Sequence, residues 1–144
     1  MSYKNKKTQD GLANSFVGII EKGIDSIVGL FLPKHKFNVF RSGELTKRWE
    51  EVERMGGNLA VIEADKLVDA ILKKASINGE SMADRMRKTE SLVDRKVYQD
   101  MWDAHKLRNS LVHDVDRLVS QYEIEIALLK MKKYLIGLGA FEGE

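Results

Sequence analysis

Apolar residues recur at helical spacing along most of this chain. Between residues 12 and 32 they gather on one half of a helical wheel, at about 100° per residue. The apolar half is Leu12, Phe16, Ile19, Ile20, Ile24, Ile27, Leu30 and Phe31, and the polar half is Asn14, Glu21, Lys22, Asp25 and Ser26. Pro33 then ends the pattern, because proline disfavours helical backbone in the residue before it. The segment is predicted to be an N-terminal amphipathic helix.

Further segments with helical spacing follow a short connection over residues 34–42. We expect main helices over 43–54, 59–75, 92–112 and 121–136, and a shorter helix over 82–88. The triplet Gly56-Gly57-Asn58 should break or kink the chain, and Asn78-Gly79, Gly137 and Gly139 should end later helices. No stretch alternates apolar and polar residues long enough for a strand. The predicted fold class is therefore all-α, an antiparallel helical bundle with four main helices.

Serine residues precede most of the expected helices. A serine side chain can accept a hydrogen bond from a free backbone N–H in the first turn, and a carboxylate three residues later can return one. The candidates are Ser42 and Ser81 as single caps, and Ser91 with Asp94 and Ser120 with Glu123 as capping boxes. These positions set the expected starts of four helices.

The chain length of 144 residues suits one domain with a large enough core to fold without cross-links. We expect residues 1–33 to form a basic N-terminus and the amphipathic helix. Residues 43–137 should form the bundle, and residues 138–144 a C-terminal tail. The absence of cysteine excludes disulfides and thiolate metal sites and agrees with a cytoplasmic location. The three histidines lack metal-ligand spacing, so we expect neither a metal nor a cofactor.

The amphipathic segment 12–32 admits three interpretations. It packs on the bundle, covers a protein partner, or lies on a membrane surface with help from Lys4, Lys6 and Lys7. Its polar half carries few charges, and three glycines weaken it as an isolated helix. Packing against protein is therefore favoured, with peripheral membrane contact as the alternative. No apolar run of about 20 residues predicts a spanning helix.

The densest polar cluster lies in residues 102–114, inside an expected core helix. Arg108, Asn109 and His113 supply a fixed cation, an orienting amide and a group that transfers protons near neutral pH. Metal-free RNA cleavage by the ribose 2′-hydroxyl requires those three roles. Residues five apart lie about 140° apart on an ideal helix, so the pair would need the helix to end or unwind near His113. The structural alternative is an Arg108 paired with a core carboxylate and a His113 that caps a helix end.

Neighbouring residues extend this candidate site. His105, Lys106 and Trp102 are candidates for substrate binding, the last by stacking on a base. Glu63 is the candidate counter-charge for Arg108, because a buried guanidinium needs one. Asp65 and Asp69 share a helix face, and solvated surface explains them equally well.

The segment Trp102 to Asp114 resembles the HEPN domains (higher eukaryotes and prokaryotes nucleotide-binding). These small all-α bundles carry an arginine, four to six further residues and then a histidine. The matching residues here are Arg108 and His113, with Asn109 at the polar position that often follows the arginine. Residues 60–69 and 78–83 also resemble a set of largely uncharacterised bacterial proteins of this type, some with an N-terminal membrane segment. The resemblance covers about residues 45 to 137, in the same order.

The resemblance implies a bundle that dimerises and pairs two Arg/His motifs across a cleft. In active members this gives metal-independent RNA cleavage of the toxin or defence type, whereas other members are antitoxin-like or scaffold modules without activity. Two hypotheses follow: an endoribonuclease that uses Arg108, Asn109 and His113, and a non-catalytic interaction module. The expected partners are a second copy with residues 92–112 near the two-fold axis, RNA, and an antitoxin or other protein. The net charge of only +2 means that RNA binding requires a local basic patch.

Overall fold

The computed structural model describes residues 36–141, and the expected helix over 12–32 lies outside them. Within this range every regular element is helical, and no strand is present. The elements are α2 (Glu44–Met55), α3 (Gly57–Lys74), α4 (Met82–Arg87), a 3₁₀ turn (Glu90–Leu92), α5 (Arg95–His113) and α6 (Gln121–Gly137). The prediction of an all-α bundle with four main helices is confirmed.

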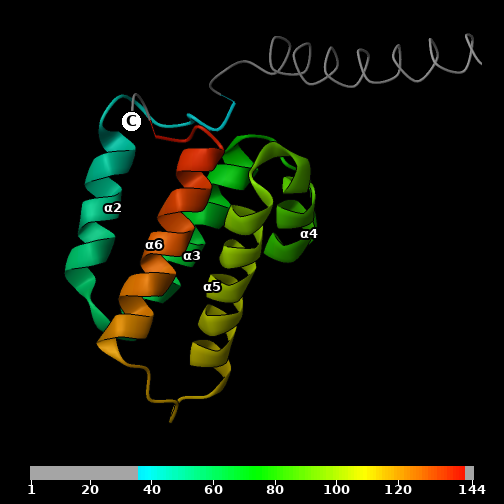
Figure 1. Cartoon of the computed structure of the whole chain (residues 1–144). Helices are drawn as coiled ribbons and strands as arrows, with labels where there is room; N and C mark the ends of the chain where they lie inside the picture. Colours follow the sequence, from blue (N-terminus) through cyan, green and yellow to red (C-terminus); the bar gives the residue numbers. More distant parts are fainter. Residues whose placement is uncertain (1–35, 142–144) are drawn as a thin grey trace, which may run out of the picture. The chain divides into compact units, whose positions relative to one another are not determined.

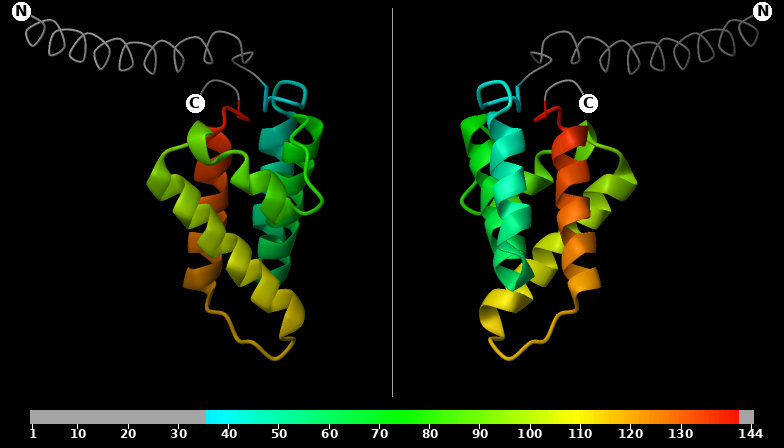
Figure 2. Two further views of the ribbon diagram at one scale, coloured as in Figure 1. Left: turned by 90° about the vertical axis from the view of Figure 1, so that its right-hand side faces the viewer. Right: turned by 90° about the vertical axis from the view of Figure 1, so that its left-hand side faces the viewer.

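The four long helices lie alongside one another as two antiparallel hairpins, α2 with α3 and α5 with α6 (Figure 1). Helix α3 packs against α2, α5 and α6, and it contributes more buried side chains than any other described helix. Helix α4 packs on α3 at the side of the bundle, and the views in Figure 2 show that α5 crosses the others at an incline. The turn at Gly56 and the loop over 114–120 therefore lie at the same end of the bundle (Figure 1).

Large aliphatic and aromatic side chains fill the space between the helices. Trp49, Met101, Met131 and Leu135 are each at most 1% exposed. A buried polar pair accompanies them, because the hydroxyls of Tyr134 and Thr89 lie 2.6 Å apart. Burial raises the pKa of the Tyr134 phenol to about 12, so this pair stays neutral at physiological pH.

The expected break between the first two bundle helices is confirmed at Gly56. Both Gly56 and Gly57 have positive φ, at 65° and 57°, and an L side chain would be strained there. The chain therefore reverses without a loop, and α3 starts at once.

Two of the four expected serine caps form. Ser81 with Asp84 and Ser120 with Glu123 each make both hydrogen bonds of a capping box. The expectations for Ser42 and Ser91 are wrong. Helix α2 follows Gly43, whose left-handed backbone (φ 73°) carries no side-chain cap. Ser91 lies inside the 3₁₀ turn, so α5 begins three residues later than expected and Asp94 itself accepts from the Lys96 N–H at 2.8 Å.

The boundaries expected for the bundle are too narrow on both sides. Phe37, in the connection before α2, is 5% exposed. Leu138 and Ala140, which begin the expected tail, are 8% and 2% exposed, and the Phe141 ring meets Trp49 edge-to-face at 6.2 Å. Apolar residues on either side of the helices thus close one end of the core. Among residues 36–141, no helix combines the length and apolarity needed to cross a membrane.

A buried ion pair joins α4 to α3. The Arg85 guanidinium donates from Nε to Asp69 Oδ1 at 2.7 Å and from Nη2 to Oδ2 at 3.0 Å. Its side chain is only 7% exposed, so the fork geometry holds a charge that solvent does not reach. Burial alone would raise the pKa of Asp69, but the hydrogen bonds from Arg85 and Lys73 outweigh it and hold that pKa below its usual range.

We expect Asp69→Asn to lower the free energy of unfolding by about 3 kcal/mol, because it leaves the buried Arg85 charge uncompensated. The matched control is Glu44→Gln, which breaks an exposed pair with Arg48 and should leave the free energy of unfolding nearly unchanged. Chemical denaturation measures both. The Asp69 contribution is present above the ordinary aspartate pKa of about 3.9. It should vanish as the pH falls through the lowered pKa of the folded state. Equal losses in the two variants would contradict the assignment.

Candidate functional site

Helix α5 presents two different faces. Its buried face carries Tyr98, Met101, Ala104, His105 and Leu111. Its outer face carries Trp102, Lys106, Asn109 and His113, which follow one another at intervals of four, three and four residues and so lie in one row. Lys106 and His113 are exposed, and Trp102 and Asn109 are half-buried. We call these four residues the α5 row.

Asp65 of α3 lies directly behind this row and is 2% exposed. Its Oδ1 lies 2.9 Å from Nδ1 of His105, and its Oδ2 lies 3.4 Å from Nε of Arg108. The Arg108 Nε is itself buried and makes no hydrogen bond of good geometry, so its link to Asp65 is mainly ionic. One buried carboxylate thus holds two side chains of α5, and they compensate the cost of burying its charge.

Asn109 links the buried part of the site to the exposed part. The Arg108 guanidinium donates from Nη1 to Asn109 Oδ1 at 3.0 Å. Asn109 stands four residues before His113, so these two share a helix face. Helix α5 ends at His113, as expected, but its backbone stays helical up to that residue. Arg108 and His113 therefore stay about 140° apart on the helix, and the Arg108 side chain reaches the α5 row through Asn109.

The expected pairing of Glu63 with Arg108 is wrong. The Glu63 carboxylate accepts a hydrogen bond from Lys66 at 2.7 Å, and Asp65 pairs with Arg108. Two residues correspond to about 200° around a helix, so the two carboxylates point to opposite sides of α3. The solvated-surface interpretation fails for Asp65, which is buried, and for Asp69, which binds Arg85.

A sequence signal for Asp65 existed. Val61, Val68 and Leu72 stand four residues before it and three and seven residues after it, so Asp65 shares their apolar face. A carboxylate on such a face needs a cationic partner from a facing helix.

Trp102 lies among polar and aromatic neighbours. Its ring meets Tyr98 and His105 edge-to-face, with centroids 6.2 Å and 6.0 Å away. The Arg87 guanidinium lies over the Trp102 ring at 5.6 Å from its centroid. Sequence reasoning missed Arg87, because it stands in a different helix and belongs to no motif. It adds a third cation to Lys106 and Arg108 around the row.

His105 differs from its expected role. It is 8% exposed and turned toward Asp65, so it holds position in the interior. A direct contact of His105 with a substrate is not supported by this burial.

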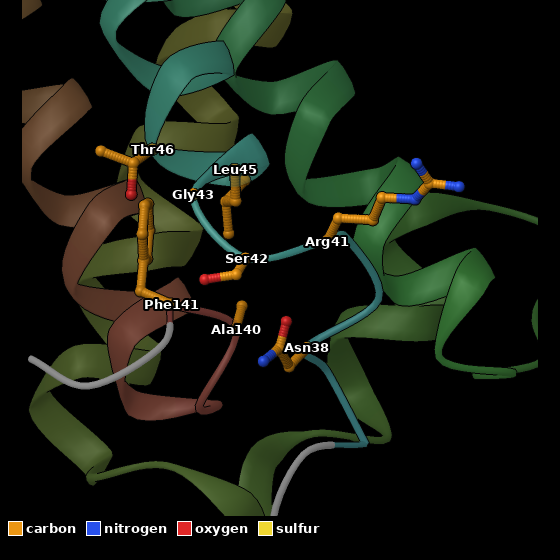
Figure 3. Close-up of a pocket in the computed structure, with 8 residues that line it drawn as sticks. All are labelled: Asn38, Arg41, Ser42, Gly43, Leu45, Thr46, Ala140 and Phe141. Atoms are coloured by element: carbon orange, nitrogen blue, oxygen red, sulfur yellow. The ribbon is translucent and has the colours of Figure 1, made fainter.

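Among residues 36–141, no three His, Asp or Glu side chains gather as a metal site would require. A hollow of about 230 Å³ at the start of α2 is equally unpromising. Figure 3 shows that its one charged residue, Arg41, points away from it, which leaves the hydroxyls of Ser42 and Thr46 and the amide of Asn38. The α5 row therefore stands out as the candidate site.

No protein-family model, curated protein or solved structure matches this chain. The likeness to the HEPN domains therefore depends on the motif residues of α5 and the two blocks before it.

We expect Asp65→Asn to lower the free energy of unfolding by about 2 kcal/mol, because it removes the charge that faces both Arg108 and His105. Glu63→Gln is the matched control on the same helix, since its pair with Lys66 is exposed and should be worth at most about 1 kcal/mol. Denaturant titration of both variants measures the difference. A Glu63→Gln variant as destabilised as Asp65→Asn would contradict the assignment of Asp65 as the buried anchor.

Proposed function

We propose that this protein is a HEPN-like endoribonuclease that cleaves RNA without a metal ion, with the α5 row as its active surface. The observation that carries the proposal is the hydrogen bond from Arg108 to Asn109, on the face that also holds His113. Asp65 anchors the arginine from behind, and Asn109, which accepts the Arg108 hydrogen bond, shares a helix face with the exposed His113.

In this proposal the ribose 2′-oxygen attacks the adjacent phosphorus and loses its proton, which forms a 2′,3′-cyclic phosphate. The bond from phosphorus to the 5′-oxygen breaks, and that oxygen gains a proton. His113 transfers one of these two protons, and Arg108 stabilises the negative charge that builds on the phosphate. Asn109 positions Arg108. Water supplies or accepts the other proton unless a second histidine is present.

The surroundings of the row suit single-stranded RNA. Lys106, Arg108 and Arg87 supply local positive charge on a chain whose net charge is only +2. Trp102 is half-buried and offers an aromatic surface for a base, which is worth about 1–3 kcal/mol per stacked base. His105 supports the site through Asp65 without touching RNA.

A homodimer belongs to the same proposal. The resemblance implies a dimer, in which the second copy would supply another Arg108 and His113. An antitoxin that covers the row is a further proposed partner.

The alternative is a non-catalytic interaction module. It is favoured by the exposed apolar residues beside His113, since Val112, Val115 and Leu118 are 44%, 91% and 97% exposed. Such residues at one end of a bundle are typical of a protein-binding surface. Peripheral membrane contact, which concerns residues 12–32, stays a proposal drawn from the sequence.

We expect His113→Ala and Arg108→Ala each to slow RNA cleavage by roughly a hundred- to ten-thousand-fold, the usual contribution of a positioned proton-transfer group or charge-stabilising donor. Activity should persist in EDTA. Lys47→Ala, which removes an exposed cation on α2, is the control and should leave the rate unchanged. Thermal unfolding of each variant shows whether a loss of activity comes from a loss of stability. This control matters most for Arg108→Ala, which leaves the buried Asp65 with one partner.

Two results would reject the enzyme. One is a purified protein that cleaves none of a varied set of single-stranded RNAs. The other is wild-type rates in both site variants. Either result favours the interaction module.

A further inference from the structure

Helix α6 is apolar on two opposite sides. Its inner side carries the core residues Ile124, Ala127, Leu128, Met131, Tyr134 and Leu135. Its outer side carries Tyr122, Leu129 and Ile136, which are 72%, 46% and 38% exposed. These three stand seven residues apart, so they form one straight row along the helix. We call them the α6 stripe. A helix that is apolar on both sides is normally covered on both sides.

The α6 stripe forms a ridge between two hollows. On one side, a hollow of about 230 Å³ between α5 and α6 includes Leu107 and Ile126 in its lining. On the other side, a hollow of about 420 Å³ between α2 and α6 includes Ile124 and Leu128. The described residues leave both open, so the whole outer surface of α6 can accept another helix.

Charges beside the stripe are divided between its two ends. Glu125 lies toward the start of α6, and Lys132 and Lys133 lie toward its end. All three stand within about 60° of Leu129 around the helix, at the edges of the stripe. Glu125 accepts a hydrogen bond only from the neutral Gln121, at 3.1 Å, and in the described part of the chain neither Lys132 nor Lys133 forms an ion pair. The Lys132 ammonium lies over the Phe141 ring, 5.8 Å from its centroid. An antiparallel copy of the same helix would place each acidic end beside a basic end.

We propose that the α6 stripe is the interface with a second copy of this chain, packed antiparallel across a two-fold axis that passes beside Leu129. Leu129 then meets Leu129 of the partner subunit, and Tyr122 meets Ile136 of the partner subunit. Glu125 faces Lys132 of the partner subunit. Each apolar residue of the stripe then faces an apolar residue of the second copy, and each acidic end faces a basic end, as a two-fold interface requires.

This inference does not depend on the proposed RNA cleavage. It moves the two-fold axis from α5, where the resemblance suggested it, to α6. A two-fold axis perpendicular to paired antiparallel helices keeps both copies of α5 on the same side of the pair. The two α5 rows therefore stay on one side of the dimer. If the protein cleaves no RNA, the dimer stands; if it is monomeric, the site on α5 is still testable.

The absence of native cysteine allows a direct test in the full chain. Leu129→Cys should form a disulfide-linked dimer under mild oxidation, because position 129 meets itself across the axis and helices in contact lie about 8–10 Å apart. Tyr122→Cys alone and Ile136→Cys alone should not, because antiparallel pairing separates each from its own copy by about 20 Å along the axis. A mixture of these last two variants should cross-link. Non-reducing gels and light scattering give the result.

Two other results of these experiments would overturn the proposed interface. Cross-linking of Tyr122→Cys and of Ile136→Cys with themselves would show parallel pairing. A full chain that stays monomeric at high micromolar concentration would show that the stripe is not an interface between two copies.

Charge exchange provides an independent readout. Glu125→Lys should weaken the dimer, and Glu125→Lys combined with Lys132→Glu and Lys133→Glu should restore it. Leu129→Lys should raise the dimer Kd roughly tenfold or more, equivalent to about 1.4 kcal/mol. Leu59→Lys is the matched control, because Leu59 is 53% exposed on α3 and lies outside the stripe. Equal effects of Leu129→Lys and Leu59→Lys would reject the interface.

Discussion

The carboxylate of Asp65 is the constraint on which the rest of the site depends. It is almost fully buried on the central helix, where an unpaired charge would be too costly to keep. Two side chains of α5 offset the cost of burying this charge. His105 makes a close polar contact with the carboxylate, and Arg108 pairs with it through its positive charge. The pairing fixes how α5 is rotated about its own axis, because both partners must face α3. That rotation in turn directs Trp102, Lys106, Asn109 and His113 outward.

Local signals in the sequence predict the helices well, since each depends on near neighbours only. Apolar spacing, the Ser81 and Ser120 caps and the glycine break at Gly56 agree with the described structure. The wrong cap predictions for Ser42 and Ser91 also have local causes. The left-handed Gly43 takes the cap position of α2, and a 3₁₀ turn forms at Ser91 where the first turn of α5 was expected. Propensity ranks such alternatives too closely to decide between them.

The site was predicted less completely because it depends on contacts between helices. The motif on α5 is visible in the sequence, but the choice between Glu63 and Asp65 as the partner of Arg108 depends on which side of α3 faces α5. The apolar neighbours of Asp65 carry that information. Arg87 over Trp102 had no comparable signal, since only packing of α4 beside α5 brings the two together.

The ion pair between Asp65 and Arg108 matters for both proposed functions. Asp65 compensates Arg108, which restrains the arginine in place but also lowers the positive charge offered to a phosphate. An enzyme would need the arginine held yet still able to attract phosphate, whereas a binding module would need only the rigid surface. His113 fits both cases, because it is exposed in the last turn of α5, where an imidazole can transfer a proton to a ligand or lie against the free carbonyls of the helix end.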